Sequence, residues 1–196
     1  MKKHIEYILF LLVATLVSGC SENLNPCGLS PATLEHFHHL DSIMDVPEIA
    51  EMHREWMKSN FDEPSILDAT NETYRFILSS SNYSKVVRIE VQNDHGSATV
   101  KEYNGTPGDP NLVPLVRQFQ LPDSTWEDLT GQLEALHFWT YPNPPERRVL
   151  HGTSWSLSAY KPIMNECTSM HYQSLSTSYT SDDPAFMAMC MLFDEL

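Results

Sequence analysis

The side chains that come closest to hydrolytic machinery lie in the C-terminal part of the sequence. Ser154, with His151 or His171 as its base, would form the nucleophile and base pair that many hydrolases use. The sequence has no GxSxG turn around a serine, no HExxH pair and no glycine-rich phosphate loop. A serine without a positioned base is a weak nucleophile, and nine histidines make such combinations easy to find. We therefore predict no catalytic residues and keep a hydrolase as the alternative.

The densest group of possible metal ligands is the run His36, His38 and His39. His36 and His39 share one face of a helix at a spacing of three, and Glu35 lies four residues before His39. Imidazole and carboxylate groups at this spacing can hold a transition metal. No second pair of ligands accompanies them, so we predict neither a metal site nor another cofactor.

Four cysteines provide the remaining reactive groups. Cys190 belongs to an apolar helical face with Phe186, Met189 and Phe193, which predicts a small buried side chain. Outside the cytoplasm, Cys27 and Cys167 are then the more probable pair for a disulfide. None of the cysteines has CxxC or zinc-ligand spacing.

The first twenty residues have the organisation of a secretory signal. Lys2 and Lys3 precede the apolar segment Tyr7–Val17, and Ser18 and Gly19 stand directly before Cys20. Eleven apolar residues at about 1.5 Å each cover roughly half of a ~30 Å hydrocarbon core. An uncleaved transmembrane helix is therefore disfavoured.

The segment LVSGC that ends at Cys20 resembles the lipobox of bacterial lipoproteins. The resemblance implies a signal peptide over residues 1–19, cleavage before Cys20 and acyl chains, palmitate among them, attached through its thiol. Residues 20–30 would then be a lipidated tether, and the domain would lie outside the cytoplasm. Ser21 in place of aspartate favours the outer membrane over the inner, by resemblance to the sorting preference of enteric bacteria.

Charge narrows the choice of partners. Cleavage before Cys20 leaves 177 residues with 10 basic and 25 acidic side chains, a formal charge of −15. Such a surface repels phosphate backbones and anionic headgroups, so we predict no nucleic-acid partner. Contact with the membrane would come through the acyl chains on Cys20, and a basic protein is the possible partner.

Periodicity predicts one α+β domain over residues 31–196, with a helical part at 31–60 and a sheet with helices at 73–196. Two short helices, Pro31–Met44 and Val46–Asn60, open it, the second with Ile49, Met52 and Trp56 on its apolar face. Consecutive alternating segments from Thr73 onward predict an antiparallel meander of about five or six strands. Helices near 124–137, opened by a capping box from Ser124 to Glu127, and 184–194 would pack against this sheet.

The block from Tyr74 to Cys190 resembles a group of uncharacterised bacterial exported proteins. The matching residues are Trp126, Phe138-Trp139, Gly152, Trp155, Leu157, His171-Tyr172 and Cys190. The resemblance implies the outline of the fold and carries no activity. Together these features predict a lipid-anchored envelope lipoprotein that binds a partner without catalysis. An immunity protein for a basic toxin is the sharper version, and a periplasmic hydrolase or a purely structural envelope lipoprotein are the alternatives.

Overall fold

The computed structural model describes Glu35 and residues 46–106, 108–141, 153–161, 172–178 and 184–196. Contacts between Cα atoms divide the chain into two units, Met1–His36 and Phe37–Leu196, and every element named below belongs to the second. Those elements are α3 (Pro47–Phe61), η1 (Ile66–Asp68), β1 (Thr73–Ser79), β2 (Ser84–Gln92), β3 (His95–Tyr103), β4 (Leu115–Gln120), α4 (Asp123–Ala135), η2 (Phe138–Thr140), β5 (Ser154–Tyr160), β6 (Tyr172–Ser178) and α5 (Pro184–Glu195). Within the described ranges, no helix combines the length and the apolar character needed to cross a bilayer.

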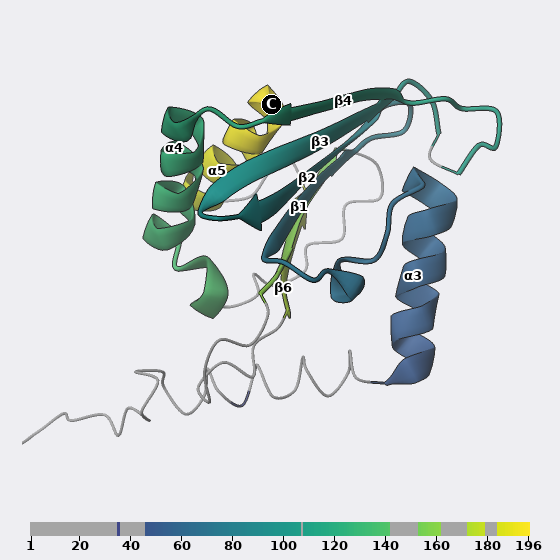
Figure 1. Cartoon of the computed structure of the whole chain (residues 1–196). Coiled ribbons are helices and arrows are strands. Elements are labelled where there is room, and N and C mark those ends of the chain that lie inside the picture. The colour runs from purple at the N-terminus through teal and green to yellow at the C-terminus, as the bar shows by residue number, and fades with distance from the viewer. Residues whose placement is uncertain (1–34, 36–45, 107, 142–152, 162–171, 179–183) are drawn as a thin grey trace, which may run out of the picture. The chain divides into compact units, whose positions relative to one another are not determined.

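The strands form one six-stranded sheet in the order β4-β3-β2-β1-β5-β6, and all neighbours are antiparallel (Figure 1). This confirms the predicted α+β fold with an antiparallel meander. The last strand, β6, lies at an edge of the sheet. The four strands from β1 to β4 follow one another directly, whereas β5 returns to the free side of β1.

A two-residue turn sets the register between β2 and β3. Gln92 pairs with His95, so Asn93 and Asp94 form the whole turn, with φ of 51° and 64°. Two consecutive positive φ values define the type I′ turn, whose twist matches that of the two strands. Asparagine and aspartate tolerate this conformation better than other side chains do.

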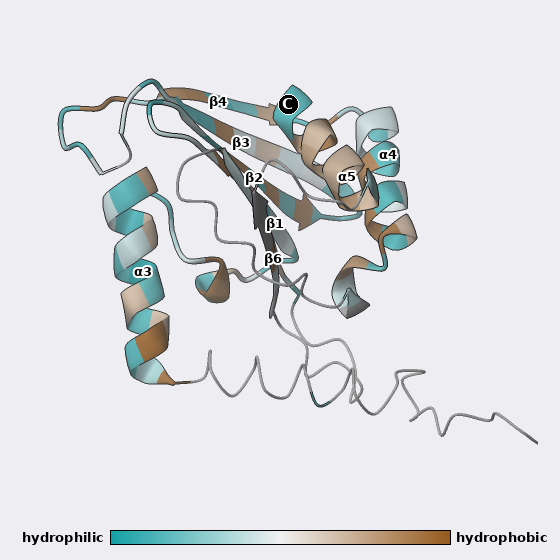
Figure 2. Ribbon diagram, turned by 180° about the vertical axis from the view of Figure 1, so that it is seen from behind, coloured by the Kyte–Doolittle hydropathy of each residue, from teal (hydrophilic) through white to brown (hydrophobic). Residues whose placement is uncertain are grey.

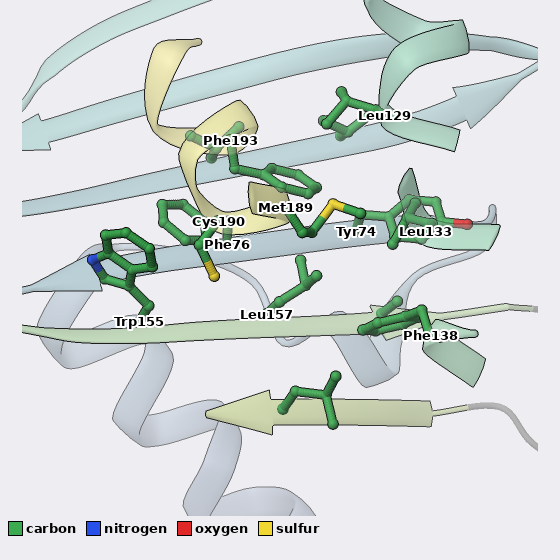
Figure 3. Close-up of a cluster of buried hydrophobic side chains, with 14 of the residues drawn as sticks. Tyr74, Phe76, Leu129, Leu133, Phe138, Trp155, Leu157, Met189, Cys190 and Phe193 are labelled. Atoms are coloured by element: carbon green, nitrogen blue, oxygen red, sulfur yellow. The ribbon is translucent and has the colours of Figure 1, made fainter. Parts of the chain in front are cut away.

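One face of the sheet packs against α4 and α5, which lie on the same side of it in Figure 1. The inward residues of β1 and β5 alternate as the sequence predicts and meet the apolar faces of both helices (Figure 3). Leu129, Leu133 and Leu136 are buried, and Trp126 packs against this core from its margin. At about 25 cal/mol per Å² of apolar surface, burial of this kind is the main stabilising contribution to the fold.

Helix α5 is apolar over most of its surface (Figure 2). Phe186, Met189, Cys190 and Phe193 are all buried against the sheet, which confirms the predicted face. Burial, and to a smaller extent the negative charge of Asp194, raises the pKa of the Cys190 thiol. Cys190 therefore stays protonated and forms no disulfide, as a small core residue would.

The predicted capping box at the start of α4 is wrong. The helix begins at Asp123, its N-cap is Pro122, and no side chain caps it. Ser124 therefore lies inside the first turn, where its hydroxyl cannot take the N-cap role. The approach of this turn to β3 depends on Gly96, because a Cβ there would lie 2.9 Å from both Leu121 Cδ1 and Trp126 Cε3.

The opposite face of the sheet is covered in part by α3 (Figures 1 and 2). Met57 and Phe61 pack there on Ile77, Val86 and Tyr103. The predicted apolar face of this helix is wrong, because the side chains of two of its members are exposed. Met52 is 64% exposed and Trp56 is 50% exposed. Apolar side chains occur on two sides of α3, and the sequence pattern selected the side that does not meet the sheet.

Candidate binding groove beside helix α4

Of the residues that the sequence offered for catalysis or metal binding, the structure describes only Ser154 and Glu35. Ser154 starts β5, is exposed, and donates a hydrogen bond of 3.5 Å to the carbonyl oxygen of Ser79. No histidine of the described part of the chain contacts it. His151 and His171 lie outside the described residues, as do His36, His38, His39, Cys20, Cys27 and Cys167.

A groove of about 550 Å³ lies at the C-terminal end of α4. It is lined by Glu72, Tyr74, Thr130, Leu133, Glu134, His137, Phe138, Trp139 and Lys161. Three of these are aromatic, two are carboxylates and one is a lysine. The volume lies within the range of about 300–1,000 Å³ that is usual for ligand sites.

Helix α4 and the short η2 supply one wall of the groove. Leu133 and Glu134 follow Thr130 by three and four residues, so these three side chains occupy one side of the helix, and His137 lies just beyond its end. His137 then adopts a left-handed conformation (φ 51°, ψ 44°), which turns the chain into η2. This turn buries Phe138 and leaves its neighbour Trp139 half-buried at the groove.

The sheet supplies the other wall through residues that are far apart in the sequence. Glu72 precedes β1 and Lys161 follows β5, and the pairing of Thr73 with Tyr160 brings the two strand ends together. Lys161 Nζ lies 3.1 Å from Glu72 Oε2 and 5.9 Å from the centre of a Trp139 ring. The lysine ammonium is therefore held by a carboxylate and an aromatic face at once.

Tyr74 contacts both partners of Lys161, Glu72 and Trp139. Its ring lies 6.1 Å from that of Trp139, and its hydroxyl donates a hydrogen bond to Glu72 Oε1. Burial, followed by the negative charge of Glu72, raises the pKa of the Tyr74 hydroxyl. The hydroxyl thus remains a donor, and it fixes the carboxylate that receives the lysine.

The charged residues on the outer surface of α4 are all acidic. Between Leu121 and Tyr141 the sequence has no lysine or arginine. The carboxylates of this segment are all exposed: Asp123, Glu127, Asp128 and Glu134. Asp123 lies 3.3 Å from His95 Nδ1, whereas Glu134, at the rim of the groove, forms no ion pair among the described residues. The helix and the groove therefore present one negative surface.

A second, smaller pocket of about 160 Å³ lies on the α3 side of the sheet. Its arginines, Arg75 and Arg88, stand among carboxylates of the same chain, including Asp68 and Glu90. Arg88 Nε lies 3.4 Å from Glu90 Oε1, so the charge of this arginine is compensated internally. Because the pocket is small and balanced in charge, we place the candidate site in the groove beside α4.

Buried polar contacts next to this pocket attach the segment after α3 to the sheet. Arg75, which is almost fully buried, donates to the carbonyl oxygen of Pro64 at 3.3 Å, and its second terminal nitrogen lies 3.4 Å from His53 Nε2. His53 Nδ1 lies 3.0 Å from Ser65 Oγ. Burial, and then the positive charge of Arg75, lowers the pKa of His53. These contacts hold α3 and the segment after it against β1.

No group of three or more histidines, cysteines or carboxylates in the described ranges could hold a metal ion. Comparison of the chain with known protein families and with curated proteins found no match.

Sequence reasoning missed the groove, although part of its signal was present. The spacing of Leu133, Glu134 and His137 before the Phe138-Trp139 pair marks the helical wall. The partnership of Glu72 with Lys161 spans 89 positions and exists only because β1 and β5 are neighbours. No local pattern could have indicated it.

Proposed function

We propose that this protein is a noncatalytic binding protein of the bacterial cell envelope, anchored by acyl chains on Cys20, and that its partner is a basic protein. The observation that carries the proposal is the surface of α4, with four exposed carboxylates and no basic residue. A surface of this kind attracts a positively charged partner and accelerates its encounter. Capture of a basic toxin, as an immunity protein does, is the most specific form of the proposal.

The anchoring part of the proposal is supported by the sequence around Cys20. A positive start, an apolar segment and small residues before the cysteine fit a lipoprotein signal. Ser21 favours the outer membrane, with the domain outside the cytoplasm. Two acyl signals are enough for stable attachment, so the domain needs no apolar membrane surface of its own.

The test is co-purification of the detergent-solubilised lipoprotein with its partner. We expect one stoichiometric basic protein, retained at about 0.05 M NaCl and released at about 0.5 M, where the Debye length is much shorter. A Cys20→Ala form serves as the control for effects of the anchor. A partner that is acidic, or whose retention does not depend on salt, would overturn the proposal, as would the absence of any partner.

A matched pair of double variants assigns the contact to α4. Glu127→Gln with Glu134→Gln removes two exposed charges seven residues apart on α4. Glu48→Gln with Glu55→Gln removes two exposed charges at the same spacing on α3. We expect the first variant to lose the partner at lower salt and the second to retain it like the natural chain. Equal behaviour of the two would contradict a role of α4.

A further inference from the structure

We propose that the groove beside α4 is a receptor site for an arginine or lysine side chain of the basic partner, and that Lys161 occupies this site in the free protein. The inference rests on the proposed function and deepens it. It names the point of contact and the residue that the partner must displace.

The groove already binds a cation of its own chain. The ammonium of Lys161 lies 3.1 Å from the Glu72 carboxylate and 5.9 Å from the centre of a Trp139 ring. The same two groups, a carboxylate and an indole face, are the ones that recognise a guanidinium. A guanidinium can also stack flat on the indole and form two parallel hydrogen bonds to a carboxylate, which an ammonium cannot do. We therefore expect arginine to compete successfully with Lys161.

Lys161 is able to leave the groove. Its side chain is 40% exposed, and it follows directly after the last residue of β5. A surface ion pair of this kind is weak, because water solvates both charges well when the pair separates. Tyr74, by contrast, is buried and keeps the Glu72 carboxylate in place when the lysine moves.

The surface next to the groove permits close approach. Glu127, Gly131 and Glu134 lie at intervals of four and three residues, along one side of α4. A Cβ added at Gly131 would meet nothing within 4 Å, so packing inside the protein does not require glycine there. A glycine in the middle of a helix costs stability, and here it leaves room for the main chain of a partner between two carboxylates.

The test measures binding of a hexa-arginine peptide to the detergent-solubilised full chain by calorimetry. Lys161→Gln removes the internal competitor, and we expect it to tighten binding by a factor of about five or more. Lys58→Gln is the matched control: Lys58 also pairs with a carboxylate, Asp62, and is 72% exposed, but it lies on α3. It changes the net charge equally, and we expect less than about a twofold effect.

A further substitution tests the indole in the absence of the competitor. Trp139→Leu in the Lys161→Gln background should weaken binding of the peptide about fivefold or more. Gly131→Gln should weaken it as well, without loss of thermal stability, because the new side chain points into open space. Equal effects of Lys161→Gln and Lys58→Gln, or unchanged binding after Trp139→Leu, would overturn the inference.

The same variants separate failure of this inference from failure of the proposed function. If the co-purified partner is lost from the α4 charge variant but binds the Trp139→Leu chain normally, the function stands and the groove is not its receptor site. If no basic partner co-purifies at all, the function fails and the inference fails with it.

Discussion

Glu63 is a buried carboxylate between two basic side chains. It is 1% exposed, and its Oε1 lies 2.7 Å from Lys101 Nζ while its Oε2 lies 3.6 Å from Arg88 Nη1. Glu63→Gln would leave two cations without their common counter-charge. We expect the free energy of unfolding to fall by about 3 kcal/mol, the size usual for breaking a buried ion pair. Urea denaturation measures this loss.

The adjacent residue is a natural control. Asp62 is also a carboxylate paired with a lysine, Lys58, but both side chains are largely exposed. Asp62→Asn preserves a residue type that tolerates the left-handed conformation found there, with φ of 47°. We expect a change below about 1 kcal/mol. If Glu63→Gln and Asp62→Asn lowered the free energy of unfolding equally, burial would not explain the contribution of Glu63 to stability.

His53 gives the fold a dependence on pH. Its pKa is lowered by burial and by Arg75, so the folded protein binds the proton less well than the unfolded chain. The stabilisation is complete above the unfolded pKa, near 6.5, and is lost as pH falls through the lower folded pKa. Glutamine at position 53 cannot take up this proton. His53→Gln should therefore reduce the loss of stability on acidification below pH 6.5, as followed by urea denaturation. An unchanged pH dependence would exclude His53 as a contributor.

Among the elements, α3 shows how an apolar pattern can mislead. The spacing of Ile49, Met52 and Trp56 is helical, and the helix is present, but Met57 and Phe61 are the residues that meet the sheet. The sheet residues that they contact are Ile77, Val86 and Tyr103. Which face of α3 is buried therefore depends on residues of β1, β2 and β3, and the sequence of α3 does not contain them.

Two methionines on α3 test this assignment directly. Met57→Ala should lower the free energy of unfolding by about 2–5 kcal/mol, because it leaves a cavity against the sheet. Met52→Ala removes the same atoms from a side chain that is mostly in solvent, and we expect less than about 0.5 kcal/mol. Thermal or urea denaturation of the two variants compares them. A larger effect at Met52 would restore the face predicted from the sequence.

Helices α4 and α5 lie close to where the sequence predicted helices. The buried residues of α4 are Leu129 and Leu133, and those of α5 are Phe186, Met189, Cys190 and Phe193, each set at helical spacing on one side of its helix. Their leucines and aromatics could therefore be assigned to the core from spacing alone. The start of α4 was predicted wrongly, because the N-cap residue is Pro122 and Ser124 lies in the first turn of the helix.

For the whole molecule, the proposed anchor gives a prediction that does not depend on the partner. The mature chain should begin at Cys20 and have the mass of its amino acids plus that of attached acyl groups. Intact-mass spectrometry of the membrane fraction measures this. Cys20→Ala should abolish the added mass and release the protein from the membrane fraction without detergent. A natural chain with no added mass would disprove the lipid anchor.

The sequence alone determined the class of the fold and the identity of the main core. Alternation with a period of two, without helices between the strands from β1 to β4, favours neighbouring antiparallel strands, and apolar residues at helical spacing favour helices that cover one sheet face. Only the tertiary structure decided which side of α3 is buried, and only it joined Glu72, Lys161 and Trp139 into one groove. The periodicity of apolar residues indicates the conformation of a segment, and this conformation is a local property. A contact between distant segments depends on the order of strands in the sheet, and no single segment contains that information.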